Sequence, residues 1–237
     1  MESPLARFEG PGTLALVGSG EYLAAVEALD RALMAGLGEP ARVVCLPTAA
    51  GSEGEERIRY WSELGVQHFT RLGAAQVQAL RVIDRESASD PVLAERIAAA
   101  NFIYLSGGKP VYLYNVLNGT PAWDAILAVL ARGGVLAGCS AGAMICGERI
   151  PTSLFSSNWQ QAFNLLAGSV IIPHFDEIPR AMQSGMRLLA GARPVFGIDG
   201  STALVCQAGS LSVLGQGGVT LIQPGGEKRY RAGEVIL

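Results

Sequence analysis

The sequence lacks the features that mark membrane proteins, secreted proteins and nucleic-acid-binding proteins. Charged residues make up only 16% of the 237 residues, and the net charge of −3 comes without a basic cluster. This charge pattern argues against nucleic acid or an anionic membrane as a partner. The long uncharged run from Gly133 to Gly147 is too short and too rich in glycine to span a bilayer. The N-terminus shows neither the basic start nor the apolar core of a signal peptide.

Cysteine and histidine are also scarce. The four cysteines lie in apolar segments without metal-ligand spacing: Cys45, Cys139, Cys146 and Cys206. We therefore expect buried, reduced thiols in a cytoplasmic protein that uses no metal and no cofactor. With only His68 and His174 present, any reaction that needs an imidazole has two candidates.

Apolar residues and glycine are plentiful, at 49% of the chain and 30 residues, which is typical of a compact protein built of sheets and helices. The length suits one domain over residues 1–237. Short apolar runs predict strands at 13–17, 42–46, 76–83, 102–105, 135–137, 170–172, 195–198 and 202–206. Between them, helical spacing or capping residues predict helices at 22–34, 53–72, 91–100, 111–117, 121–132 and 178–190.

This alternation predicts an α/β fold of three layers, with a mostly parallel sheet and helices on both faces. The turn-rich residues after 206 predict an antiparallel meander at the margin of the sheet. In such sheets the functional loops gather beyond the carboxyl ends of the strands. The turn Gly18-Ser19-Gly20 follows the first strand but lacks the third glycine of a dinucleotide-binding site, which excludes a Rossmann cofactor.

The segment Gly138-Cys139-Ser140-Ala141-Gly142 follows a buried strand and fits the nucleophile elbow, G-x-S-x-G. In that turn the central residue adopts strained dihedral angles, and the flanking glycines relieve the crowding. Ser140 would therefore stand at the start of the next helix, where free N–H groups can stabilise an oxyanion. Cys139, one place off centre, is expected to point into the packing.

A serine nucleophile needs a base, because its hydroxyl is too weak an acid to ionise at neutral pH. His174 directly follows a predicted strand, where a loop can reach the elbow, whereas His68 lies inside a predicted helix. We therefore expect His174 to be the base and His68 to be structural or at the surface. A third, orienting acid is harder to choose. Glu148 would suit the order of the classical α/β-hydrolases, but the early histidine argues against that fold; the remaining candidates are Asp176, Glu177 and Asp199.

Taken together, these segments resemble the serine peptidases that include cyanophycinase and dipeptidase E, and more closely the cyanophycinase branch. The matching pieces are Gly18-Ser19-Gly20-Glu21, Pro47-Thr48-Ala49, Gly107-Gly108, the elbow extended to Ala143, His174-Phe175, and Gly197-Ile198-Asp199 followed by Thr202-Ala203. The resemblance implies a class I glutamine-amidotransferase-like fold. It also implies Ser140 as nucleophile, His174 as base and the backbone N–H groups of Gly108 and Ala141 as oxyanion hole.

The chain departs from the cyanophycinase pattern at two places. That pattern has Gly-Gly-Asp-Gln where this chain has Gly107-Gly108-Lys109-Pro110, and it has a glutamate, thought to orient the histidine, where this chain has Gly200. Asp199 would face the other side of its strand and cannot simply inherit that role. Three explanations stay open: Asp176 or Glu177 orients His174, the enzyme is a Ser-His dyad helped by water or Ser201, or the site binds without catalysis.

Two side chains are candidates for substrate binding. Lys109 would place an ammonium group beside the oxyanion hole, and Trp159 belongs to a polar and aromatic segment, 148–162, that could line the substrate or lie at the surface. The sequence thus predicts a serine peptidase or amide hydrolase that acts on a small or unusual peptide other than cyanophycin. The alternatives are a binding or regulatory protein with a degenerate site and an amidotransferase-like enzyme that uses Cys139. A homodimer is compatible with the sequence.

Overall fold

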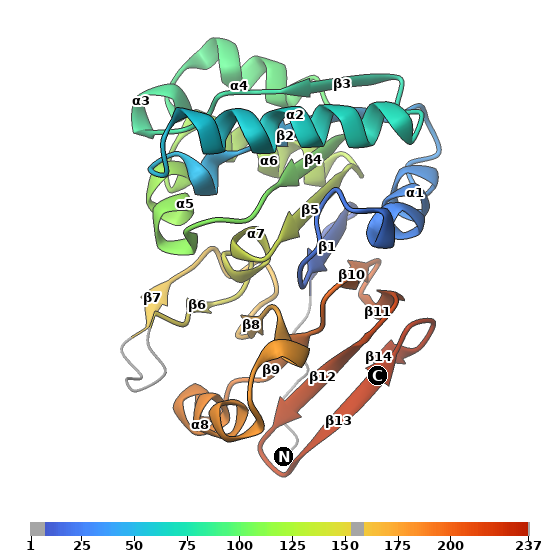
Figure 1. Ribbon diagram of the computed structural model, residues 1–237, viewed down its shortest axis with the longest axis vertical. Coiled ribbons are helices and arrows are strands. Elements are labelled where there is room, and N and C mark those ends of the chain that lie inside the picture. Colours follow the sequence, from blue (N-terminus) through green and yellow to red (C-terminus); the bar gives the residue numbers. More distant parts are fainter. Residues whose placement is uncertain (1–7, 153–158, 237) are drawn as a thin grey trace.

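The computed structural model describes residues 8–152 and 159–236. Its largest element is an eight-stranded sheet with the strand order β14-β11-β10-β1-β5-β4-β2-β3 (Figure 1). The neighbours β1, β5, β4, β2 and β3 run parallel, whereas β10, β11 and β14 pair antiparallel. The strands are β1 (Thr13–Val17), β2 (Arg42–Leu46), β3 (Gln76–Ala79), β4 (Phe102–Leu105), β5 (Val135–Cys139), β10 (Thr202–Gln207), β11 (Ser210–Gly215) and β14 (Val235–Ile236).

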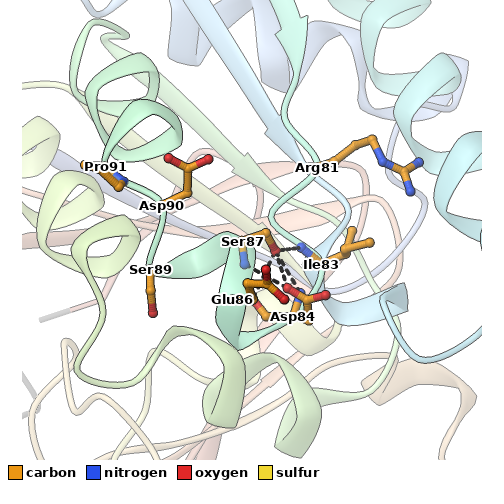
Figure 2. Close-up of a pocket in the computed structure, with 8 residues that line it drawn as sticks. All are labelled: Arg81, Ile83, Asp84, Glu86, Ser87, Ser89, Asp90 and Pro91. Carbon is orange, nitrogen blue, oxygen red and sulfur yellow. Dashed lines mark hydrogen bonds between the residues drawn. The ribbon is translucent and has the colours of Figure 1, made fainter.

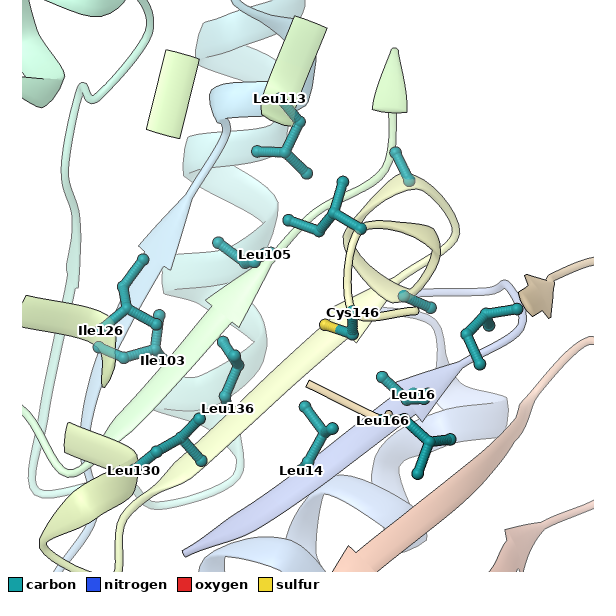
Figure 3. Close-up of a cluster of buried hydrophobic side chains, with 14 of the residues drawn as sticks. Leu14, Leu16, Ile103, Leu105, Leu113, Ile126, Leu130, Leu136, Cys146 and Leu166 are labelled. Carbon is teal, nitrogen blue, oxygen red and sulfur yellow. The ribbon is translucent and has the colours of Figure 1, made fainter. Parts of the chain in front are cut away.

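Helices cover both faces of this sheet, as the alternating sequence predicts. Because side chains alternate along a strand, Leu14 and Leu16 of β1 point to one apolar cluster, and Ala15 and Val17 point to another. The first cluster, drawn in Figure 3, lies against α4 (Pro91–Ala98), α5 (Pro110–Leu117) and α6 (Pro121–Ala131). The second lies against α1 (Glu27–Ala35) and α2 (Glu55–Arg71). The three-layer arrangement is therefore confirmed.

A second sheet of six strands, which the sequence did not predict, lies below the parallel strands of the first in Figure 1. Its order is β13-β12-β9-β8-β6-β7, and the helix α8 (Arg180–Ala190) lies beside it. The strands are β6 (Arg149–Ile150), β7 (Gln160–Gln161), β8 (Val170–Ile172), β9 (Val195–Ile198), β12 (Gly218–Gln223) and β13 (Gly226–Arg231).

The C-terminal meander is antiparallel, as predicted, but it is divided between the two sheets. Strands β10 and β11 extend the large sheet, and β12 and β13 pair with β9 in the second. Alternation of apolar residues indicates that each run is a strand, but it does not indicate which strand is its neighbour. The pattern therefore could not predict that these strands belong to two different sheets. The turn at Gly217 is tight enough that a Cβ atom there would lie 2.7 Å from Thr202 Oγ1.

Several element ends differ from the sequence prediction. The helix expected over 22–34 begins with a 3₁₀ turn, Ala24–Val26, and becomes α-helical at Glu27. The third strand ends at Ala79 rather than at 83, and a short helix, α3 (Arg85–Ala88), follows it. The predicted cap of α4 is present, since the carboxylate of Asp90 accepts a hydrogen bond from the Val92 N–H at 2.8 Å.

His68 has a structural environment. Its side chain is buried, and Nε2 lies 2.7 Å from Asp30 Oδ2, between helices α2 and α1. Burial raises the pKa of Asp30, and the hydrogen bond and charge of His68 oppose part of that rise. None of the helices in the two described ranges is both long and apolar enough to cross a membrane.

Candidate active site

Ser140 lies in a sharp turn between β5 and the short helix α7 (Ala141–Met144). Its dihedral angles are φ 51° and ψ −106°, a conformation that L-residues rarely adopt. The flanking glycines are required sterically: a Cβ at Gly138 would lie 2.4 Å from Gly142 O, and one at Gly142 would lie 2.7 Å from Leu105 O. The turn therefore has the strain and the crowding that the elbow motif predicts.

His174 lies directly after β8, in the left-handed conformation with φ 52° and ψ 34°, and it precedes a 3₁₀ turn over Phe175–Glu177. Its Nε2 atom lies 3.2 Å from Ser140 Oγ. That distance is within hydrogen-bonding reach for a free enzyme, in which such contacts are often long. The second sheet thus places the imidazole of His174 next to Ser140, at the edge of the eight-stranded sheet.

Glu177 is the predicted acid that contacts the imidazole. Its Oε1 atom lies 3.3 Å from His174 Nδ1, on the side of the ring opposite Ser140. The main chain also closes the turn, because the Glu177 N–H donates to His174 O at 3.0 Å. Both side chains are substantially exposed, at 41% for His174 and 63% for Glu177, so water weakens this interaction.

The other acids have different partners. Asp176 accepts a hydrogen bond from the Gly200 N–H at 2.8 Å. Asp199 accepts from the Gly218 N–H at 2.8 Å and is paired with Arg229. Glu148 is bonded to Arg193 at 2.8 Å, and this hydrogen bond lowers its pKa. No contact with His174 is formed by these three carboxylates in the described part of the chain.

Ala141 directly follows Ser140, and Gly108 follows Gly107, at which a Cβ would lie 3.5 Å from Ser140 Cβ. Ala141 is the first residue of α7, so its N–H has no partner within the helix. Gly108 has φ 141°, and a Cβ there would lie 2.6 Å from the main chain of Ala49. Within residues 8–152 and 159–236, neither N–H donates to a protein acceptor. Gly108 and Ala141 therefore each have a main-chain N–H that the described part of the protein leaves without an acceptor.

Lys109 and Pro110 follow this loop. The Lys109 N–H donates to Ala49 O at 2.9 Å, and its exposed ammonium lies 3.2 Å from Ser52 Oγ. Pro110, which has no N–H, begins α5. Trp159, by contrast, is buried among apolar side chains of the second sheet, including Val170 and Phe175, so little of it can reach a ligand. Of the predicted loop, Ser153, Phe155, Ser156, Ser157 and Asn158 lie outside the described residues.

Cys139 is fully buried beneath the elbow, with its Sγ atom 3.0 Å from Glu21 Oε2. Burial, and secondarily the nearby Glu21 carboxylate, raises the pKa of this thiol. The amidotransferase alternative requires an exposed, easily ionised thiol at the elbow. The position of Cys139 argues against it.

We expect native protein to resist alkylation at Cys139. Iodoacetamide reacts with thiolates, and the burial and raised pKa of this thiol leave it both inaccessible and protonated at neutral pH. Peptide mass spectrometry after treatment at pH 7.5 should find Cys139 unmodified in folded protein and modified in urea. Rapid modification of Cys139 in the folded protein would restore the cysteine-based alternative.

A cavity of about 490 Å³ lies away from Ser140, at α3 and the start of α4 (Figure 2). Polar side chains that line it form hydrogen bonds or ion pairs with neighbouring residues. Asp84 caps α3 by accepting from the Ser87 N–H at 2.8 Å, Asp90 caps α4, and Arg81 is paired with Glu55 at 2.6 Å. Within the described ranges, no group of three or more His, Cys, Asp or Glu side chains is arranged to hold a metal ion.

Comparison with known proteins gives a consistent family match. The family model described as "Peptidase family S51" matches residues 14–214. Cyanophycinase of Trichormus variabilis is 30% identical over an alignment of 173 residues, with 67% of this chain and 57% of that protein covered. Cyanophycinase of Synechococcus elongatus is 30% identical over 167 residues, covering 66% and 52%. The matched part thus spans little more than half the length of these relatives.

Solved structures match over almost the whole chain. A peptidase from an acI-B1 Actinobacterium has a TM-score of 0.87 and 36% identity, covering 97% of this chain and 98% of its own. A putative peptidase E protein from Listeria monocytogenes EGD-e has a TM-score of 0.61 and 20% identity, covering 94% and 99%. At that lower identity the second match bears on the fold alone.

Proposed function

The chain belongs to peptidase family S51, and from that premise we propose that it hydrolyses a peptide or amide bond through an acyl-enzyme on Ser140. The observation that carries the proposal is the 3.2 Å approach of His174 Nε2 to Ser140 Oγ at a strained elbow. A binding protein with a degenerate site would have no need of that geometry. Labelling by a fluorophosphonate that requires Ser140 tests the proposal against this rival.

In the proposed reaction, His174 Nε2 takes the proton from Ser140 Oγ as the oxygen attacks the substrate carbonyl carbon. The carbonyl oxygen becomes an oxyanion, and the N–H groups of Gly108 and Ala141 stabilise it. The imidazolium then gives its proton to the leaving nitrogen as the C–N bond breaks. A water molecule, deprotonated by the same imidazole, hydrolyses the resulting ester and regenerates the serine.

Glu177 is the proposed orienting acid. By accepting from Nδ1–H, its carboxylate favours the tautomer in which Nε2 is free to take the serine proton, and it stabilises the imidazolium that follows. Gly200 stands where relatives of the cyanophycinase branch carry the glutamate, and its N–H is bonded to Asp176 of the same turn as His174. The proposed orienting acid therefore lies in the same turn as His174, and not at the position of Gly200 between β9 and β10.

Glu177→Gln is expected to slow acylation by a factor of about 10 to 100. This is less than the factor of about 10,000 for a buried triad carboxylate, because Glu177 is exposed and its contact with His174 is screened by water. The measurement is the rate of fluorophosphonate labelling. Asp176→Asn makes the same change of charge one residue away and should change that rate by less than about threefold. Equal rates for Glu177→Gln and wild type would favour a Ser-His dyad.

The proposed substrate is a small or unusual peptide. Cyanophycin is disfavoured, because Lys109 and Pro110 replace the polar pair of the cyanophycinase pattern and Pro110 offers no N–H. The exposed ammonium of Lys109, adjacent to Gly108, would suit a substrate carboxylate near the scissile bond.

A further inference from the structure

Glu21 is a buried acidic residue to which the proposed reaction assigns no role. It follows the turn Gly18-Ser19-Gly20 at the end of β1, and only 9% of its surface is exposed. A buried carboxylate is costly unless hydrogen bonds satisfy it. The hydrogen bonds of the Glu21 carboxylate therefore indicate the role of this residue in the structure.

The two carboxylate oxygens bond to two different loops. Oε1 accepts from the Gly107 N–H at 2.9 Å, and Oε2 lies 3.0 Å from Cys139 Sγ, which donates to it. Glu21 therefore joins the end of β1 to the residues after β4 and to the last residue of β5. The fit at Gly107 is close, because a Cβ there would lie 2.6 Å from Oε1 and 3.5 Å from Ser140 Cβ.

The loop after β4 presents four consecutive N–H groups, and the protein accepts three of them. Ser106 donates to Leu46 O at 3.3 Å, Gly107 to Glu21 at 2.9 Å and Lys109 to Ala49 O at 2.9 Å. In the described ranges the N–H of Gly108 has no such acceptor. The pattern leaves one N–H for a ligand, in the residue after Gly107, which itself lies against Ser140. Of the three acceptors, Glu21 is the only side chain; the other two are main-chain carbonyls.

We infer that Glu21 is a positioning residue that holds the Gly107-Gly108 segment so that the Gly108 N–H faces the developing oxyanion. This inference rests on the proposed function. Two adjacent glycines have wide conformational freedom, so an anchor on Gly107 is needed to fix the direction of the next peptide N–H. A preorganised donor stabilises the transition state more than the bound substrate, so Glu21 acts on the acylation rate rather than on binding.

Two conservative variants separate the position of the acceptor from its charge. Glu21→Gln keeps an oxygen that can accept a hydrogen bond from the Gly107 N–H. Glu21→Asp keeps the charge, but its side chain is shorter by one methylene group, which moves the carboxylate away from Gly107. With p-nitrophenyl acetate as the probe, the burst phase yields an acylation rate constant and a dissociation constant. Removing one oxyanion donor costs a factor of about 100 to 1,000, so partial misplacement in Glu21→Asp is expected to slow acylation at least about tenfold. The dissociation constant should change less than about twofold, and Glu21→Gln should acylate within about threefold of wild type.

Asp30→Asn is the matched control, because Asp30 is also a buried carboxylate, but its side chain is hydrogen-bonded to His68 and not to the Gly107-Gly108 segment. It should lower the midpoint of thermal unfolding and leave the acylation constant within about twofold of wild type. Wild-type acylation in Glu21→Asp, or equal slowing in Glu21→Gln and Glu21→Asp, would overturn the inference. A wild-type burst that is unaffected by Ser140→Ala would instead overturn the proposed function, and the inference with it.

Discussion

Ser140→Ala is expected to abolish the burst of p-nitrophenol that wild-type protein gives with p-nitrophenyl acetate. The burst reports transfer of the acetyl group to Ser140 Oγ, and alanine offers no atom that can accept it. Loss of a serine nucleophile in a peptidase lowers turnover by a factor of about 10⁶, and the remaining donors of Gly108 and Ala141 keep only a residual rate. Stopped-flow absorbance should therefore show a burst equal to the enzyme concentration in wild type and none in the variant.

The control for this variant is Ser62→Ala. Ser62 is a partly buried serine on α2 whose hydroxyl donates to Ile58 O at 2.7 Å, and α2 contributes no residue to the proposed site. Its loss should leave the burst unchanged. A burst of full amplitude in Ser140→Ala would place the nucleophile at another residue and would contradict the mechanism.

His174→Gln is expected to slow acylation by a factor of at least about 10⁴, because the Ser140 hydroxyl loses the base that lies 3.2 Å away. Glutamine approximates the size of imidazole but cannot take a proton at neutral pH. Adding free imidazole should restore part of the rate if the defect is the missing base. The same stopped-flow measurement, with and without imidazole, checks both statements.

His68→Gln is the matched variant, since His68 is the second histidine of the chain. It should destabilise the protein, because it breaks the buried pair with Asp30, while the acylation rate of the folded fraction stays near that of wild type. Equal acylation by His174→Gln and wild type would remove His174 from the mechanism. If added imidazole restores none of the rate lost in His174→Gln, the role of His174 is structural.

The sequence predicted the elbow well because its chemistry is local. Gly138 and Gly142 indicate a turn so crowded that a Cβ atom does not fit at either position. The strained dihedral angles of Ser140 follow from that turn. The strands β1 and β4 were also visible, since each is a short apolar run with glycine soon after it. Loops at one edge of a parallel sheet then follow from topology.

Long-range partners could not be read in the same way. The choice between Asp176, Glu177 and Asp199 depends on the left-handed backbone of His174, which turns Glu177 toward the ring, and on hydrogen bonds that occupy the other two. The role inferred for Glu21 could not be predicted, because it depends on contacts among residues at the ends of three strands that are distant in the sequence. The second sheet was missed because the apolar pattern of a strand does not reveal which strand it pairs with.

The most direct test of the central claim is the site at which a fluorophosphonate reacts. Trypsin releases residues 133–149 as one peptide, in which Ser140 is the only hydroxyl-bearing residue. The proposed mechanism predicts one phosphonyl group per molecule, located on Ser140 by fragmentation, with labelling that is lost in Ser140→Ala and strongly slowed in His174→Gln. A folded protein that stays unlabelled, or that is labelled at another residue, would contradict the account.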